Sequence, residues 1–305
     1  MINLTAEVVA TFILVICLGG TGKQVFRSLN EMLTDLSETL PENARSAIQP
    51  FYIDADRVPD GQERTYHCYY TDFSVFAGPV WENYRAQRFP LNLGSKIIAD
   101  SRSGAGAVRV FGNASLAASR DKIRELLEQA RKLVPQPYQR VFIVGGGCGG
   151  TASSQLIDLA ALIKEFYRSY GQTVPIDIVL TGPEIQYEGR IQDTVRDRMK
   201  ANHYALLKEL NHYCHHPFSS AYRSMDPELQ INNTAGGERL FDWVYYFNDC
   251  RPQREITWSI AEMLMHFGLS AVGGDLASIL PNERENRDLL YPLDFVHADH
   301  EEICS

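Results

Sequence analysis

The sequence lacks an excess of basic residues. Its 29 Lys and Arg are outnumbered by 38 Asp and Glu, which gives a formal net charge of -9 over 305 residues. Binding to nucleic acid depends on clustered Lys and Arg side chains that neutralise phosphates. The composition therefore argues against nucleic acid as the main partner of this chain.

Cysteines are few and lack the spacing of a disulfide framework. The 6 cysteines are Cys17, Cys68, Cys148, Cys214, Cys250 and Cys304. Scattered cysteines in a chain of this length are typical of reduced thiols, whereas small secreted domains use dense, regularly spaced pairs. We therefore expect a cytoplasmic protein.

The apolar run at residues 8–18 is too short for a membrane span. It falls well below the ~20 residues that a membrane-spanning helix needs. Glu7 precedes it without any basic residue, and the run leads into Gly-Gly-Thr-Gly instead of a small-residue cleavage site, which argues against a signal peptide. We interpret the run as a buried parallel strand and expect no membrane span.

Apolar runs alternate with segments of helical period along most of the chain. We expect strands at residues 9–18, 49–54, 140–144, 176–180 and 241–247. We expect helices at residues 23–40, 120–133, 154–170, 192–213 and 255–267. Apolar strands separated by helices are typical of an α/β fold with a parallel sheet covered on both faces. Residues 57–118 are rich in Gly, Ser, Tyr and Pro, which predicts loops with short elements.

Two of the expected strands end in glycine clusters. The first loop spans residues 19–24 and reads GGTGKQ, and the second loop spans residues 145–154 and reads GGGCGGTASS. In a parallel sheet both would lie at the carboxyl edge, where helix N-termini present free backbone N–H groups and glycine allows close approach to phosphate oxygens. One cluster alone is as typical of a tight turn, but the pair predicts a polyphosphate site.

Neither loop has a common nucleotide-binding fingerprint. The pattern G-x-G-x-x-G needs a third glycine where this chain has Val25. The pattern G-x-x-x-x-G-K-[ST] needs a glycine and a hydroxyl where the chain has Cys17 and Gln24. A nicotinamide or flavin oxidoreductase stays an alternative, because Asp54 supplies the acidic residue expected after the second strand.

The pair of loops resembles the tubulin/FtsZ superfamily, and the loop sequences are most similar to those of the bacterial tubulin-like proteins. In that family a first GGxGxx loop holds the phosphates of the nucleotide, and a later GGTxS loop wraps them and adds a hydroxyl. In the first loop the resemblance assigns nucleotide binding to Gly20, Thr21, Gly22, Lys23 and Gln24. In the second loop it assigns nucleotide binding to Gly149, Gly150, Thr151, Ala152 and Ser153.

The second loop departs from the family pattern. The family's G-G-T-G-S-G is GGTASS in this chain, so Ala152 and Ser154 replace glycines. An alternative register would place Cys148 at the position of the family's threonine. We prefer the register with Thr151, because residues 156–160 (LIDLA) then fall where the family's helix begins.

Acidic and glycine positions between the loops also match the family. The resemblance places Asp54 and Asp56 near the magnesium ion and the γ-phosphate, with or without an intervening water. Magnesium favours oxygen ligands and retains waters, so one or two carboxylates are sufficient. Residues 104–109 (GAGAVR) together with Gly112 and Asn113 resemble the region that senses the γ-phosphate.

The resemblance continues after the second loop. Glu188 matches the glutamate that holds the ribose hydroxyls, and Arg198 matches an arginine that reaches the nucleotide. Asn248 follows a strand, as does the family's base- and ribose-contacting asparagine.

Trp258 and Glu262 are spaced to contact guanine. They are four residues apart and would share one face of a helix. In FtsZ an aromatic ring and a carboxylate at this spacing stack on guanine and accept from its N–H groups. Such a carboxylate would reject adenine. A tryptophan on an amphipathic helix is also typical of a packed core, so both interpretations stay open.

The resemblance also predicts the domain organisation and the catalytic group. We expect a Rossmann-like tubulin/FtsZ GTPase domain at residues 1–275, with a central helix near residues 254–268. Residues 276–305 would be a short tail or a remnant of the family's second domain, which is missing or much reduced. FtsZ's catalytic pattern N-x-D-x-x-D is absent from residues 268–276, where Asp275 is the acidic candidate for orienting a water.

The function that the resemblance implies is that of a cytoskeletal GTPase. Such a protein binds GTP or GDP with Mg²⁺, hydrolyses GTP to GDP and phosphate, and associates with itself into a homo-oligomer or filament, or with a partner protein. Backbone N–H groups and the metal would assist in-line attack of water. The first alternative is a non-hydrolysing regulatory or scaffold module, and the second is the dinucleotide-binding oxidoreductase.

Overall fold

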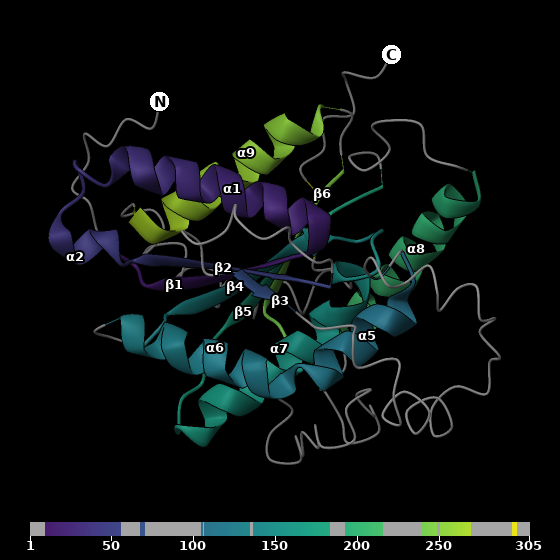
Figure 1. Ribbon diagram of the computed structural model, residues 1–305, viewed down its shortest axis with the longest axis horizontal. Coiled ribbons are helices and arrows are strands. Elements are labelled where there is room, and N and C mark those ends of the chain that lie inside the picture. The colour runs from purple at the N-terminus through teal and green to yellow at the C-terminus, as the bar shows by residue number, and fades with distance from the viewer. Residues whose placement is uncertain are drawn as a thin grey trace.

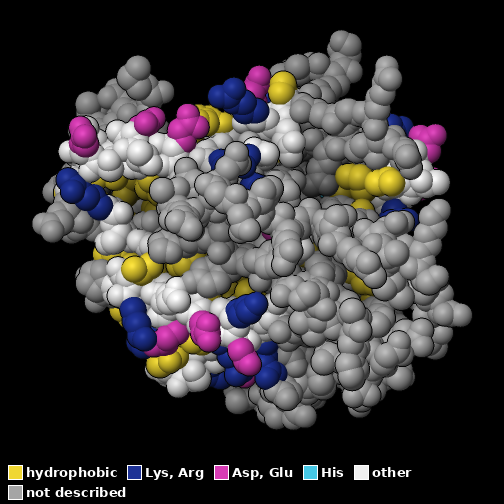
Figure 2. Space-filling view, viewed as in Figure 1, with side chains coloured by type: hydrophobic (Ala, Val, Ile, Leu, Met, Phe, Trp, Pro, Cys, Tyr) yellow, Lys and Arg dark blue, Asp and Glu magenta, His cyan; other side chains and the backbone are white. Residues whose placement is uncertain are grey.

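Figure 1 shows the computed structural model, in which helices cover both faces of a parallel sheet. The structure describes residues 10–55, 68–70, 105, 107–134, 137–183, 193–215, 239–248, 251–269 and 295–297. None of the helices within these ranges is long and apolar enough to cross a membrane. On the face seen in Figure 2, the acidic and basic side chains of these residues are interspersed instead of gathered by sign.

The sheet reverses its strand order at β1. Its described strands are β1 (Ile13–Leu18), β2 (Ile48–Asp54), β3 (Cys68–Tyr70), β4 (Arg140–Gly146), β5 (Ile176–Thr181), β6 (Trp243–Phe247) and β7 (Phe295–His297). They form a 7-stranded sheet in the order β3-β2-β1-β4-β5-β6-β7, and all neighbours are parallel. The chain thus moves outward from β1 and then returns to place β4 on its other side. Open α/β sheets bind ligands at such a switch point, beyond the carboxyl ends of the strands.

The central strands are buried on both faces, as their continuous apolar runs predict. Successive side chains of β1 point to opposite faces of the sheet. Residues 13, 15 and 17 belong to the core beneath α1 (Gly19–Leu36) and α9 (Gln253–Leu269), and residues 14, 16 and 18 to the core beneath α6 (Arg120–Leu133) and α7 (Ala152–Ser169) (Figure 1). The other described helices are α2 (Glu42–Arg45), α5 (Arg109–Ala118) and α8 (Asp193–His215).

The expected parallel α/β fold is confirmed, with one local correction. Helix α1 begins at Gly19 instead of residue 23, because the first loop itself forms the first helical turn. Among the loops with short elements expected at residues 57–118, the structure shows one helix of 10 residues, α5, whose position the sequence does not predict. Gly112 and Asn113 lower the helix propensity of that segment. Tertiary packing overrides it, since α5 buries Phe111 and packs on α7.

A buried ion pair joins the amino-terminal ends of β4 and β5. Arg140 Nη1 lies 2.6 Å from Asp177 Oδ2, and the two side chains are 5% and 0% exposed. Both charges are therefore removed from water, and each depends on the other. A buried pair of this kind contributes little net stability, but removal of one partner leaves an uncompensated charge.

We predict that Asp177→Ala lowers the free energy of unfolding by about 3–5 kcal/mol, because Arg140 is left buried without its counterion. Urea unfolding measures this change. Glu165→Ala is the control, since Glu165 pairs with Arg124 at 2.9 Å while both side chains stay about a third exposed or more. Loss of an exposed pair costs less than about 1 kcal/mol. Equal losses in the two variants would contradict the prediction.

Candidate nucleotide site

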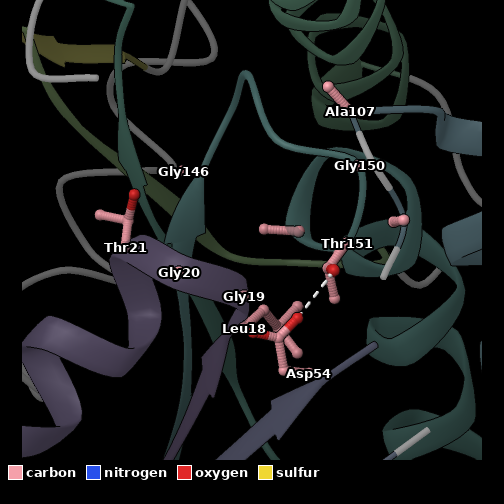
Figure 3. A pocket seen from close by; sticks show the side chains of 11 residues that line it. Leu18, Gly19, Gly20, Thr21, Asp54, Ala107, Gly146, Gly150 and Thr151 are labelled. Atoms are coloured by element: carbon pink, nitrogen blue, oxygen red, sulfur yellow. Dashed lines mark hydrogen bonds between the residues drawn. The ribbon is translucent and has the colours of Figure 1, made fainter. Parts of the chain in front are cut away.

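A cavity of ≈ 190 Å³ lies at the switch point between β1 and β4 (Figure 3). It is lined by Leu18, Gly19, Gly20, Thr21, Asp54, Ala105, Ala107, Gly146, Gly150, Thr151 and Ala152. These residues come from both glycine loops, the end of β2 and the segment before α5. Pockets that enclose a drug-sized ligand have volumes of about 300–1,000 Å³. The cavity is therefore of a size for one part of such a ligand, such as its phosphates.

The two glycine loops contact each other at this cavity. Gly19 has a φ of +66°, a conformation that favours glycine, and turns the chain directly from β1 into α1. A Cβ at Gly19 would lie 3.3 Å from the Cβ of Thr151. A Cβ at Gly20, in contrast, would meet nothing within 4 Å. Gly20 therefore faces open space on the cavity side of α1.

Two helix N-termini meet at the cavity without side-chain caps. The N-cap residues of α1 and α7 are Leu18 and Thr151, and neither makes a capping hydrogen bond through its side chain. Neither helix has an acidic residue in its first turn. The first N–H groups of a helix have no intrahelical partner and form the positive end of its dipole. Both ends therefore favour an anion in the cavity.

The side chain of Thr151 does not cap α7, because its hydroxyl makes a hydrogen bond to another residue. It donates a hydrogen bond of 2.9 Å to Oδ1 of Asp54 (Figure 3). The carboxylate of Asp54 is 4% exposed, and it also accepts from the N–H of Ala55 at 2.7 Å and from the hydroxyl of Tyr52. Three of the roughly four acceptor positions of a carboxylate are thus occupied. Asp54 holds the second loop to the end of β2 and retains little capacity for a further ligand.

In the second loop, Ala152 and Ser154 replace glycines of the family pattern. The loop accommodates both residues because each packs against another glycine. A Cβ at Gly145 would lie 2.6 Å from the Cβ of Ala152, so the methyl group of Ala152 occupies space that Gly145 leaves free. The hydroxyl of Ser154 turns back and donates to the carbonyl of Gly150 at 2.6 Å. The side chains of Ala152 and Ser154 therefore fit into the loop without changing the course of its backbone.

Comparison with known proteins identifies the family of this chain. A family model described as "Tubulin like" matches residues 85–253, which is more than half of the chain. The chain belongs to this tubulin-like family. No curated protein matches its sequence.

One solved structure shares the fold of this tubulin-like chain, and a second is similar to it. CetZ2 from Haloferax volcanii, a GTPγS-bound protofilament, is 13% identical with a TM-score of 0.50, and the match covers 83% of this chain and 57% of that chain. TubZ from the Clostridium botulinum phage c-st is 12% identical with a TM-score of 0.47 over 88% and 64% of the two chains. At 13% identity the likeness to CetZ2 shows the fold alone. The chain spans little more than half the length of CetZ2.

Several of the predicted residues of the tubulin-like chain lie together at the cavity. Those that line it are Gly20, Thr21, Asp54, Gly150, Thr151 and Ala152. Gly22, Lys23, Gln24, Gly149 and Ser153 belong to the same two loops but do not line it. The Nζ of Lys23 lies 5.8 Å from the ring centre of Tyr52, and the hydroxyl of Ser153 donates to the carbonyl of Gly149. The match to residues 104–109 contributes Ala105 and Ala107 to the lining.

Other predicted residues lie away from the cavity lining. The carbonyl of Gly112 accepts a 2.9 Å bond from Gln155, so Gly112 and Asn113 lie in α5 behind the second loop. Arg198 is exposed on α8, and Asn248 is exposed after β6 with its side chain over Gly182.

Trp258 and Glu262 share one face of α9, as their spacing predicts, and they bond to each other. Trp258 Nε1 donates to Glu262 Oε1 at 3.2 Å, and the indole packs against the core shared by α1 and α9. Neither residue is part of the cavity lining. Asp56, Glu188 and Asp275 lie outside the described residues.

Sequence patterns did not indicate the residues that support the second loop from α8. Asn202 and His203 are both buried, and His203 Nε2 lies 2.9 Å from the hydroxyl of Tyr246. A Cβ at Gly147 would overlap the ring of His203. Burial lowers the pKa of His203 from 6.5 to about 4, so its ring is neutral at neutral pH. Polar residues in a long helix ordinarily face solvent, so nothing in the sequence indicated that Asn202 and His203 would be buried.

Matched glycine variants test the packing of the second loop. A Cβ at Gly150 would lie 2.5 Å from the Cβ of Ala105 and 2.9 Å from the N of Val108, whereas a Cβ at Gly149 would meet nothing within 4 Å. We expect Gly150→Ala to lower the free energy of unfolding by about 1–3 kcal/mol through overpacking. Gly149→Ala should change it by less than about 0.5 kcal/mol. Urea unfolding measures both, and equal effects would contradict this packing.

His203 gives the fold a testable pH dependence. Its pKa is 6.5 in the unfolded chain and about 4 in the fold, so the unfolded chain binds more protons between these values. The contribution of His203 is therefore complete above pH 6.5 and is lost as the pH falls toward 4.

Between pH 7 and 4 we expect wild type to lose up to about 3 kcal/mol more unfolding free energy than His203→Gln, measured in urea. Parallel pH profiles for wild type and His203→Gln would show that the imidazole is not buried in its neutral form.

Proposed function

We propose that this tubulin-like chain binds a guanine nucleotide together with Mg²⁺, with the phosphates in the cavity between the two glycine loops. The observation that carries the proposal is the meeting of two uncapped helix N-termini, from α1 and α7, at one cavity. A chain with an acidic net charge of -9 needs such a local source of positive potential to bind a polyanion.

Each part of the cavity has a proposed role. The backbone N–H groups at Gly20 and Thr21 would bind phosphate oxygens from the side of α1, and those at Gly150 and Thr151 would bind them from the side of α7. Magnesium, when bound, would neutralise charge on the phosphates. Asp54 fits a contact to the metal through water better than direct ligation, because three hydrogen bonds already occupy its carboxylate.

The proposed GTP hydrolysis needs a carboxylate that is not among the described residues lining the cavity. Asp54 is the one carboxylate among the described lining residues, and it is committed to holding Thr151. We propose that Asp275, or an acidic residue of a neighbouring copy in an assembled oligomer, orients the attacking water. Self-association would then be coupled to turnover.

A non-hydrolysing regulatory module is the second candidate, and the engagement of Asp54 favours it. GTP binding without phosphate release at high protein concentration would select this candidate. The same engagement counts against a dinucleotide oxidoreductase, in which the acidic residue after β2 must be available to accept from a ribose hydroxyl.

Substitution of Gly20 separates nucleotide binding from folding. Gly20→Asp places a carboxylate in the open space beside the cavity, where its repulsion of phosphate should weaken GTP binding at least ~100-fold. The same charge at the N-terminus of α1 should leave the ligand-free protein as stable as wild type, or more stable by about 0.3–1 kcal/mol. Calorimetric titration with GTP and ATP, and urea unfolding, measure the two effects.

Gly20→Ala is the matched control, because its methyl group meets no neighbour and adds no charge. It should bind GTP nearly as wild type does. Equal GTP affinities for the Asp and Ala variants, or equal affinities of wild type for GTP and ATP, would refute the proposed site or its preference for guanine.

A further inference from the structure

Helix α8 reaches the rear of the cavity through one buried amide. The side chain of Asn202 donates a hydrogen bond of 2.8 Å to the carbonyl of Ala107 and another of 3.1 Å to the carbonyl of Cys148. Asn202 is 7% exposed. Its two acceptors belong to different segments, since Ala107 precedes α5 and Cys148 lies in the second loop. One NH₂ group, with two N–H donors, thus joins both segments.

Ala107 adopts a backbone conformation that needs such support. Its φ is 58°, the one positive φ of a non-glycine residue in the described part of the chain. Clashes involving Cβ disfavour this left-handed region for L-amino acids, so it persists only where the surroundings hold it. A backbone hydrogen bond of 2.7 Å from the N–H of Val108 to the carbonyl of Ala105 closes a turn around Ala107. The hydrogen bond from Asn202 holds the Ala107 carbonyl from outside this turn, so both contacts support the conformation.

A second contact from α8 supports the same assembly. Arg109 Nε donates to the carbonyl of Ser153 at 3.0 Å, and the guanidinium of Arg109 pairs with Glu209. Asn202 and Glu209 are seven positions apart on α8, about two helical turns, and so lie on one face. That face holds residues 107–109 and the second loop together.

The interface between these segments is too tight to absorb a displacement. Figure 3 shows Ala107 and Gly150 side by side at the cavity. A Cβ at Gly150 would lie 2.5 Å from the Cβ of Ala105 and 2.9 Å from the N of Val108, so the two backbones are in close contact. A shift of Ala107 would therefore move Gly150, and with it the N-terminus of α7.

We propose that Asn202 is a positioning residue for the phosphate cavity. By binding the carbonyls of Ala107 and Cys148 at the same time, it sets the spacing between residues 107–109 and the second loop. It touches no ligand itself, because it is absent from the cavity lining. The consequence for nucleotide affinity rests on the proposed function, whereas the consequence for loop order does not.

Asn202→Ala tests this role. Loss of two hydrogen bonds should weaken GTP binding by about tenfold or more. In the ligand-free protein, amide hydrogens of residues 147–151 should exchange faster, while those of α9 should exchange at the wild-type rate. The control is Lys200→Ala, on the exposed side of the same helix, which should change neither measurement. A general loss of stability would instead accelerate exchange in both regions.

A second variant tests the mechanism through Ala107. Glycine adopts positive φ without a steric cost, so Ala107→Gly should partly restore GTP binding and loop protection when combined with Asn202→Ala. A merely structural role of Asn202 predicts no such recovery. If Asn202→Ala does not fold, Asn202→Ser, which keeps one donor, replaces it in the same cycle and should give an intermediate loss.

The outcomes separate this inference from the proposed function. If the wild-type protein does not bind GTP, the proposed nucleotide site is refuted. The hydrogen-exchange measurement on the ligand-free protein would still decide the role of Asn202. Wild-type exchange rates at residues 147–151 in the Asn202 variant would overturn the inference. So would the absence of any recovery with Ala107→Gly.

Discussion

The pairing of β1 with β4 is the constraint on which the candidate site depends. The two strands lie side by side in parallel, and Leu18 is opposite Gly145 in their register. Because each strand is followed by a helix, this pairing places the N-termini of α1 and α7 at the same height of the sheet. A shift of register would separate the two loops along the strand direction by about 3.3 Å per residue. The contact between Gly19 and Thr151, and the bond from Thr151 to Asp54, follow from this alignment.

The sequence was sufficient to predict a parallel sheet with both glycine loops at its carboxyl edge, because these signals are local, but it did not predict that β1 pairs with β4. Continuous apolar runs such as ILVICL and RVFIVGG can be stable only where both faces are covered, which indicates a parallel sheet. Glycines directly after such strands then indicate where the backbone must approach something closely. The same reasoning failed at α5, where Gly112 and Asn113 suppress the helical signal and packing on α7 supplies the missing stability. The partners of Asp54 and Asn202 could not be predicted either, since each bond joins residues far apart in the chain.

The structure also explains how the second loop tolerates its two departures from the family pattern. A glycine is replaceable where a neighbouring glycine leaves room for the added atoms. Gly145 leaves this room for Ala152. Ser154 satisfies its own hydroxyl by donating to Gly150, so it places no unpaired polar group in the core. The replacements therefore preserve the course of the backbone, on which a cradle of N–H groups depends, although they change its sequence.

The electrostatics of the cavity explain why geometry matters more here than side-chain charge. The chain is acidic overall, and no Lys or Arg is present among the described residues that line the cavity. Within the described lining, the attraction for an anion would come from backbone dipoles at two helix ends, which act over about one helical turn. Such a source has no long, adaptable side chain that could follow a displaced ligand. In the proposed site, residues that hold the two helix ends and the facing segment at a fixed distance, such as Asp54 and Asn202, would therefore determine binding as much as the loops themselves.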